Sequence, residues 1–137
     1  TPNALEDLVR ARYERYKIVE KKEQRAEEYR TEDADVIVVA YGASGRVARS
    51  AVNKAREAGK KVGLIRPITL WPFPKDAIKR AADHTKELLV VEMSMGQMVD
   101  DVRLAAECRV PVHFYGRTGG VIPTPKEILG EIDKLLK

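Results

Sequence analysis

Four largely apolar runs constrain the fold of this chain more than any other feature. They are Val36–Ala40, Val62–Ile65, Leu88–Val91 and Val110–Phe114. A strand with one face in water alternates apolar and polar residues, whereas a strand that is apolar throughout is covered on both faces. Strands of this second kind are typical of a parallel sheet that lies between two layers of helices. The runs therefore predict an α/β fold.

The segments after these runs carry apolar residues at helical spacing, so each is predicted to form a helix that covers the sheet. The stripes are Val47, Ala48, Ala51, Val52 and Ala55 in the first helix, Met95, Met98, Val99, Val102 and Ala106 in the third, and Ile128, Leu129, Ile132, Leu135 and Leu136 in the last. Two helix starts carry capping-box signals, at Thr124 with Glu127 and at Ser94 with Gln97. Repeats of strand and helix with right-handed crossovers predict a three-layer α/β/α sandwich with a mainly parallel sheet.

A long helix is predicted ahead of the first strand, over residues 3–28. Its apolar and aromatic residues lie near helical spacing, at Leu5, Leu8, Val9, Tyr13 and Tyr16. From residue 21 to residue 30 nearly every residue is charged or alanine, which is typical of a solvated helix that connects two domains. The sequence thus divides into a connecting helix over 1–30 and an α/β domain over 31–137.

Composition argues against several classes of partner. The formal net charge is +4, but acidic and basic residues alternate along the chain without a basic tract, so no nucleic acid is expected. The single cysteine, Cys108, is expected to be packed and inert, and it leaves no internal disulfide and no cysteine cluster for a metal or iron–sulfur site. The lone cysteine favours a reducing, cytoplasmic setting. No apolar run approaches the roughly 20 residues that span a bilayer, so no membrane contact is expected.

The turn after the first run is a candidate anion site. It contains Gly42, Ser44 and Arg46 at the predicted start of a helix. Backbone N–H groups at such a start bind phosphate or carboxylate, and Arg46 can add a bidentate contact. The alternative is that a tight turn simply needs glycine. Arg66 ends the second strand, where a dinucleotide-binding fold places an acidic residue, so NAD is disfavoured.

Two further strand ends complete this candidate crevice. Glu92 follows the third run, and we expect it to pair with one of the two arginines just named, with a role on a substrate as the alternative. Arg117, Gly119 and Gly120 follow the fourth run and either cradle an anion or only turn the chain. No nucleophile with a base, carboxylate dyad or metal set emerges, so no catalytic residue and no metal ligand is predicted.

The segment Ile65–Pro74 carries the only tryptophan of the chain, Trp71, among prolines. Prolines around Phe73 reduce the entropy that the loop loses when it is ordered. An ordered aromatic loop suits protein contact. Trp71 and Phe73 are therefore candidate interface anchors, or they cover the core of their own domain.

This segment, together with Gly116–Pro125, resembles the C-terminal domain of the α subunit of 2-oxoacid:ferredoxin oxidoreductases that act on 2-oxoisovalerate or 2-oxoglutarate. The resemblance covers about residues 28–137. It implies the fold of the transketolase C-terminal domain, with the strand at Val36 placed between those at Val62 and Leu88. The topological switch point of the sheet would then lie between the turns after the first and third strands.

The resemblance also implies a function. The intact enzyme of this family decarboxylates a 2-oxoacid oxidatively on thiamine diphosphate with Mg, transfers the acyl group to coenzyme A, and passes electrons through iron–sulfur clusters to ferredoxin. The diphosphate motif and the cysteine clusters of that enzyme do not occur in this chain. The implied role of this domain is assembly and the shaping of an inter-domain space, without a cofactor of its own.

The implied partners are the other domain of the α subunit, the β subunit, the iron–sulfur subunits and ferredoxin. The alternative from a different class is a freestanding α/β module that binds a small anion or a nucleotide. Such a module would use the serine and arginines of the crevice, with Ser44, Arg46, Arg66 and Arg117 as ligands.

Overall fold

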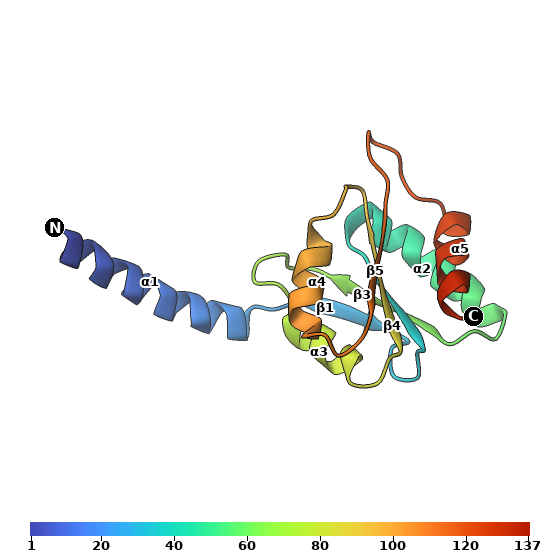
Figure 1. Ribbon diagram of the computed structural model, residues 1–137, viewed down its shortest axis with the longest axis horizontal. Helices are drawn as coiled ribbons and strands as arrows, with labels where there is room; N and C mark the ends of the chain where they lie inside the picture. The colour runs from blue at the N-terminus through green and yellow to red at the C-terminus, as the bar shows by residue number, and fades with distance from the viewer.

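The computed structural model describes residues 1–137 and holds five helices and five strands (Figure 1). The helices are α1 Pro2–Lys22, α2 Gly42–Glu57, α3 Lys75–Ala82, α4 Met98–Ala106 and α5 Pro125–Leu135. The strands are β1 Ala26–Tyr29, β2 Val36–Val39, β3 Val62–Pro67, β4 Glu87–Glu92 and β5 Val112–Gly116. All strands form one sheet in the order β1-β3-β2-β4-β5, in which β1 alone is antiparallel to its neighbour.

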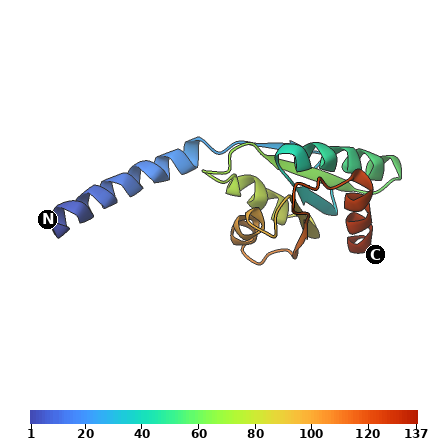
Figure 2. The same cartoon turned by 90° about the horizontal axis from the view of Figure 1, so that it is seen from above.

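The sheet lies between two helix layers. Helices α2 and α5 contact each other on one face, and α3 and α4 contact each other on the opposite face (Figure 2). The run that forms β2 is apolar throughout because its residues pack alternately on the two faces of the sheet. Val36 and Val38 belong to the core cluster with α2 and α5, and Ile37 and Val39 belong to the cluster with α3 and α4. Both faces exclude water, so the predicted three-layer sandwich is confirmed.

The strand order agrees with the resemblance. β2 pairs in parallel with both β3 and β4, and it therefore lies between them. The chain leaves β2 toward β3 and reaches β4 only by crossing to the other side. The turns after β2 and β4 thus diverge at the carboxyl end of the sheet, which is the place where open α/β sheets bind ligands.

Residues 26–29 form a strand instead of the end of the predicted helix. β1 is the edge of the sheet and pairs with β3. The charged side chain of Glu27 in β1 forms ion pairs with two residues of the domain, Arg49 and Arg66. The Arg49 guanidinium also lies over the ring of Tyr29, 4.1 Å from its centroid. Edge strands commonly carry charged residues, so charge density alone did not separate this strand from a solvated helix.

Helix α1 extends away from the α/β domain (Figures 1 and 2). The Thr1 hydroxyl accepts a hydrogen bond from Ala4 N at 3.2 Å and caps its start. None of its 21 residues is buried. The C-terminal half of the helix contacts the domain, through the ring of Tyr16 and through Glu20, whose carboxylate lies 3.9 Å from Lys75 Nζ. The apolar stripe of α1 is therefore open to solvent along most of its length.

Helix α4 begins at Met98, later than its apolar stripe suggested. Met95 is 84% exposed and lies outside the core, whereas Met98 is buried. The Ser94 hydroxyl accepts from Gly96 N at 3.1 Å and does not cap the helix, so the capping box predicted there is wrong. The capping box predicted at the start of α5 is confirmed.

The chain turns sharply after α4. Glu107 and Cys108 both adopt the left-handed conformation, with φ of 52° and 62°. This turn leaves the Cys108 thiol exposed, so the prediction that it is packed is wrong. A thiol next to small apolar residues in the sequence was not sufficient to place it in the core.

Candidate functional site

A hollow of about 110 Å³ opens at the predicted switch point. It lies between the start of α2, which follows β2, and the end of β4. Its lining residues are Tyr41, Gly42, Ala43, Ser44, Glu92 and Met93. Three of the predicted crevice residues, Gly42, Ser44 and Glu92, are thus brought together, and we call this hollow the crevice.

Glu92 is 1% exposed and serves as the cap of α4. One carboxylate oxygen accepts from Met98 N at 2.8 Å and the other from Val99 N at 3.0 Å. Gln97 N and the Ser94 hydroxyl also donate to it, at 3.2 Å and 3.3 Å. A negative charge is stabilised at the positive end of a helix dipole. The predicted ion pair with an arginine is wrong, because the backbone of α4 supplies the donors instead.

The turn after β2 requires glycine at one position. Gly42 has φ of +58°, a conformation that residues with a Cβ rarely adopt. Gly45, one turn into α2, contacts the side chain of Arg66, and a Cβ there would lie 3.1 Å from Ala40 O. Ser44 is buried in the same turn. The structural interpretation of this glycine-rich turn is therefore supported, and it does not exclude a site at the helix start.

The predicted arginines do not converge on the crevice. Arg46 is exposed on α2. Arg66 Nη2 lies 3.0 Å from Glu27 on the edge strand. Arg117 Nη1 donates to Glu127 at 2.8 Å. This pair lies beside α5, after the edge strand β5 at the opposite end of the sheet order from β1. These last two arginines are neutralised by carboxylates that the predicted crevice did not include.

Glu127 is the centre of a small network at the start of α5. It accepts hydrogen bonds from Tyr115 Oη at 3.0 Å, from Arg117 and from Thr124 N at 3.3 Å. Desolvation raises the pKa of Glu127, but the Thr124 N–H, the Tyr115 hydroxyl and Arg117 together lower it below its usual value. This network fixes both ends of the loop between β5 and α5.

That loop extends beyond the strand ends (Figure 1). Gly119 and Gly120 have φ of +67° and +80° and face open space. The side chains of Val121 and Ile122 are exposed next to them. The two glycines therefore turn the chain, and they lie away from the residues that line the crevice.

The two predicted anchors have different environments. Phe73 is half-buried against the core of its own domain. Trp71 is 58% exposed and packs edge-to-face on Tyr16 of α1, with 5.3 Å between ring centroids. Tyr13 lies one turn further along α1, 5.7 Å from Tyr16. We call Tyr13, Tyr16 and Trp71 the aromatic cluster, and it joins the stripe of α1 to the domain.

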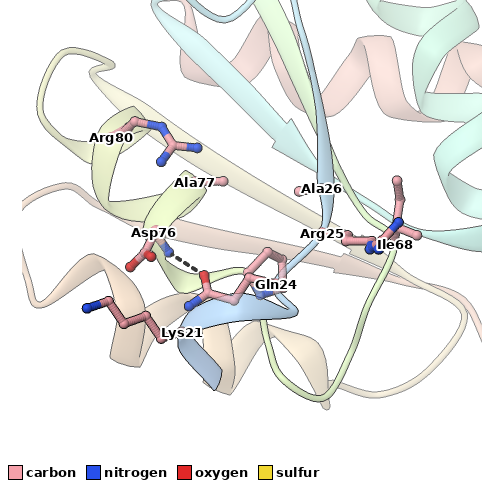
Figure 3. A pocket seen from close by; sticks show the side chains of 9 residues that line it. Lys21, Gln24, Arg25, Ala26, Ile68, Asp76, Ala77 and Arg80 are labelled. Carbon is pink, nitrogen blue, oxygen red and sulfur yellow. Dashed lines mark hydrogen bonds between the residues drawn. The ribbon is translucent and has the colours of Figure 1, made fainter. Parts of the chain in front are cut away.

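A larger hollow of about 440 Å³ lies where α1 meets β1 and α3 (Figure 3). Lys21, Arg25 and Arg80 line it together with Asp76. Gln24 Oε1 accepts from Asp76 N at 3.1 Å and so caps α3 from the end of α1. No sequence signal indicated this contact, since a single glutamine and a helix start about 50 residues away have no local pattern in common.

Membrane spans and metal clusters are both missing from the structure. No helix has both the length and the apolar character that crossing a bilayer demands. No three His, Cys, Asp or Glu side chains lie close enough together to bind a metal ion.

Comparison with known families agrees with this architecture. Residues 34–128 match the model of the pyruvate:ferredoxin oxidoreductase core domain II. The chain belongs to that family. The match includes β2 to β5 and ends within α5, so it contains the crevice, whereas α1 and β1 lie outside it.

Curated relatives of this core domain II are subunits of oxidoreductases. The ketoisovalerate oxidoreductase subunit VorB of Methanothermobacter thermautotrophicus is 49% identical over 87% of this chain and 34% of its own length. The 2-oxoglutarate synthase subunit KorA of Methanothermobacter marburgensis is 43% identical over 74% of this chain and 27% of its own length. The chain thus spans about a third of the length of the curated relatives it matches. A freestanding anion-binding module is not favoured.

Solved structures share the fold of this core domain II. The 2-oxoglutarate:ferredoxin oxidoreductase from Magnetococcus marinus, solved with 2-oxoglutarate, coenzyme A and succinyl-CoA bound, matches the whole chain with a TM-score of 0.87 and 24% identity, over 24% of its own chain. A split-gene transketolase, an inactive β4 tetramer, matches 82% of this chain and 41% of its own with a TM-score of 0.66 and 19% identity. The transketolase-like architecture is confirmed.

Proposed function

We propose that this chain acts as the second core domain of the α subunit in a thiamine-dependent 2-oxoacid:ferredoxin oxidoreductase. The complex would convert a branched-chain 2-oxoacid or 2-oxoglutarate to its acyl-CoA and reduce ferredoxin. The names of the relatives support the two substrate classes. The coenzyme A bound in the related enzyme from Magnetococcus marinus supports the acceptor. The cytoplasm is the proposed compartment, which suits an exposed free thiol.

The residues of this chain do not fit the cofactors of that reaction. A single cysteine cannot hold an iron–sulfur cluster, which needs several cysteine ligands. No cluster of carboxylates is available for the Mg ion that accompanies thiamine diphosphate. We therefore place the iron–sulfur clusters, and Mg with its thiamine diphosphate, on other domains and subunits, and we assign no residue of this chain to coenzyme A.

The observation that carries a non-catalytic role is the environment of Glu92. It is the acid at the switch point, and the Ser94 hydroxyl and the N–H groups of Gln97, Met98 and Val99 donate to its about four lone-pair positions. A general base needs a free lone pair within reach of the proton that it removes. We infer that Glu92 holds the fold and leaves the chemistry to other parts of the complex.

Assembly is the role that α1 and the aromatic cluster support. The exposed apolar residues of this surface are Leu5, Leu8, Val9, Tyr13, Tyr16 and Trp71. A contiguous apolar surface on a folded domain marks a contact with another protein. Most of the stability of a protein helix comes from packing of its apolar face, so a partner that covers the stripe would stabilise α1. We propose that the other domain of the α subunit and the β subunit cover this surface.

Trp71→Ala tests the assembly role in the intact complex. Loss of an exposed tryptophan anchor should weaken subunit association about tenfold or more, while the chain itself stays folded. Sedimentation velocity measures the association, and circular dichroism measures the fold. Leu104→Ala is the matched control, because Leu104 is 77% exposed on α4, away from this surface. Equal association of both variants and the parent would contradict the proposal.

A further inference from the structure

The start of α2 presents backbone donors that have no acceptor within the protein. Its N-cap residue, Tyr41, makes no side-chain hydrogen bond to the helix. The first N–H group of this turn with a backbone partner is that of Gly45, which donates to Tyr41 O at 3.1 Å. The N–H groups of Gly42, Ala43 and Ser44 precede it, and such groups need an acceptor from outside the helix. They also form the positive end of the helix dipole.

The Ser44 hydroxyl is a further donor in the same place. Ser44 is 4% exposed, and none of the side-chain hydrogen bonds of the structure includes its hydroxyl. Arg66 Nε is the one side-chain nitrogen or oxygen that is both sealed from solvent and without a partner. The Ser44 hydroxyl is therefore not sealed, and the small surface that Ser44 retains lies in the crevice, which it lines. A bound acceptor would therefore replace water at this hydroxyl, which donates to no group of the protein.

Size and charge select the kind of acceptor. A hollow of about 110 Å³ is much smaller than the sites that hold drug-sized ligands or nucleotides. Glu92 forms part of its wall, and its negative charge repels a dianion such as phosphate more than a monoanion. The positive end of the α2 dipole supplies the charge that attracts an anion, because Arg66 is already paired with Glu27. A single carboxylate group satisfies these conditions best.

We propose that the start of α2 is a carboxylate-binding site, in which the N–H groups of Gly42, Ala43 and Ser44 and the Ser44 hydroxyl donate to the bound oxygens. The carboxylate belongs to a small organic acid or to an Asp or Glu side chain of a neighbouring polypeptide. The carboxylate site goes beyond the proposed function and does not depend on it, because its donors lie within this chain and apart from the surface that Trp71→Ala tests.

Sodium acetate is the probe for the 137-residue chain. In a titration followed by amide NMR shifts, the resonances of Gly42, Ala43 and Ser44 should move along a common saturable curve. Ser44→Ala should weaken the apparent binding about tenfold, because a hydrogen bond to a charged group is lost. Ser50→Ala, on the exposed side of the same helix, should bind as the parent does. Thermal melting checks the fold of Ser44→Ala, whose lost hydroxyl had no partner.

Two results would overturn the proposal. One is the absence of a saturable shift at these three amides in the parent chain. The other is equal acetate binding by Ser44→Ala and Ser50→Ala. Inorganic phosphate is the charge control. Phosphate binding tighter than acetate would contradict the proposal that the negative charge of Glu92 disfavours a dianion.

The intact complex separates the two sources of the carboxylate. If the site takes a small acid, acetate should still protect the amides of residues 42–44 from hydrogen exchange in the complex. If a neighbouring side chain fills it, those amides should be protected without acetate, and Ser44→Ala should weaken assembly. Either result supports a carboxylate site and names its ligand.

Discussion

The α/β domain and helix α1 carry similar amphipathic patterns, but only the domain buries them. In α2, Ala48, Ala51 and Val52 are completely inaccessible to solvent, whereas Leu5 and Leu8 of α1 are more than half exposed. A stripe at helical spacing therefore tells which side of a helix is apolar, and it does not tell what covers that side. The difference divides the molecule into a part that stabilises itself and a part that we expect a partner to stabilise.

Glu92→Ala should have the largest effect on the domain. The substitution leaves the N–H groups at the start of α4 without their acceptor and removes a buried charge that they stabilise. We expect a loss of about 3 kcal/mol in the free energy of unfolding, because several buried donors lose a charged partner. Urea unfolding measures it. Glu57→Ala, at an exposed position near the end of α2, is the control and should change little.

Gly63→Ala should follow in size. A Cβ at Gly63 would lie 2.5 Å from Arg30 O, a backbone atom directly after β1 that moves only with the main chain. Overpacking of this kind costs about 1–3 kcal/mol. Gly130→Ala is the matched control, because Gly130 lies within α5 and its Cβ would meet open space. That control should stabilise the chain slightly. Equal destabilisation by both variants would count against the close approach of Gly63 to Arg30.

Acid should weaken the edge strand through Glu27. The hydrogen bond from Arg49, together with the charge of Arg66, lowers the pKa of Glu27 below its ordinary value of 4.5. A lowered pKa in the folded state means that this contribution is complete above pH 4.5 and is lost as the pH falls through the lowered value. The stability difference between the parent and Glu27→Gln should therefore stay constant from about pH 7 to pH 5 and shrink as the pH falls further toward pH 3. A difference that is constant over the whole of this range would disprove the assignment.

Leu8→Ala should have the smallest effect on the isolated chain. Leu8 is exposed on α1, so the free energy of unfolding should change by less than about 0.5 kcal/mol. The same variant should weaken assembly of the complex. Glu92→Ala and Gly63→Ala should instead act mainly on the stability of the isolated chain. Destabilisation of the isolated chain by more than about 1 kcal/mol would mean that α1 packs on the domain.

Features that depend on local patterns were predictable from the sequence. The apolar runs predicted the sandwich, and the resemblance supplied the place of β2 between β3 and β4. The start of α4 was misplaced because its cap, Glu92, belongs to the preceding strand instead of the four-residue box at Ser94. A local capping pattern does not reveal a cap that lies outside it.

The candidate site was predicted only in part, for the same reason. Arg66 and Arg117 were identified at the correct strand ends, but their partners, Glu27 and Glu127, come from an edge strand and a helix that no spacing rule connects to them. The unpartnered hydroxyl of Ser44 is a tertiary property. A motif can suggest that a donor is present, and only the fold shows whether the donor is already used.

Hydrogen exchange of the 137-residue chain, compared with the same chain in the intact complex, tests the central claim most directly. The account predicts that the amides of β2 and β4 are protected in both states, and that those of α1 exchange rapidly in the isolated chain and become protected in the complex. Strong protection of α1 in the isolated chain, or rapid exchange of α1 in both states, would contradict the claim that this helix is an assembly surface.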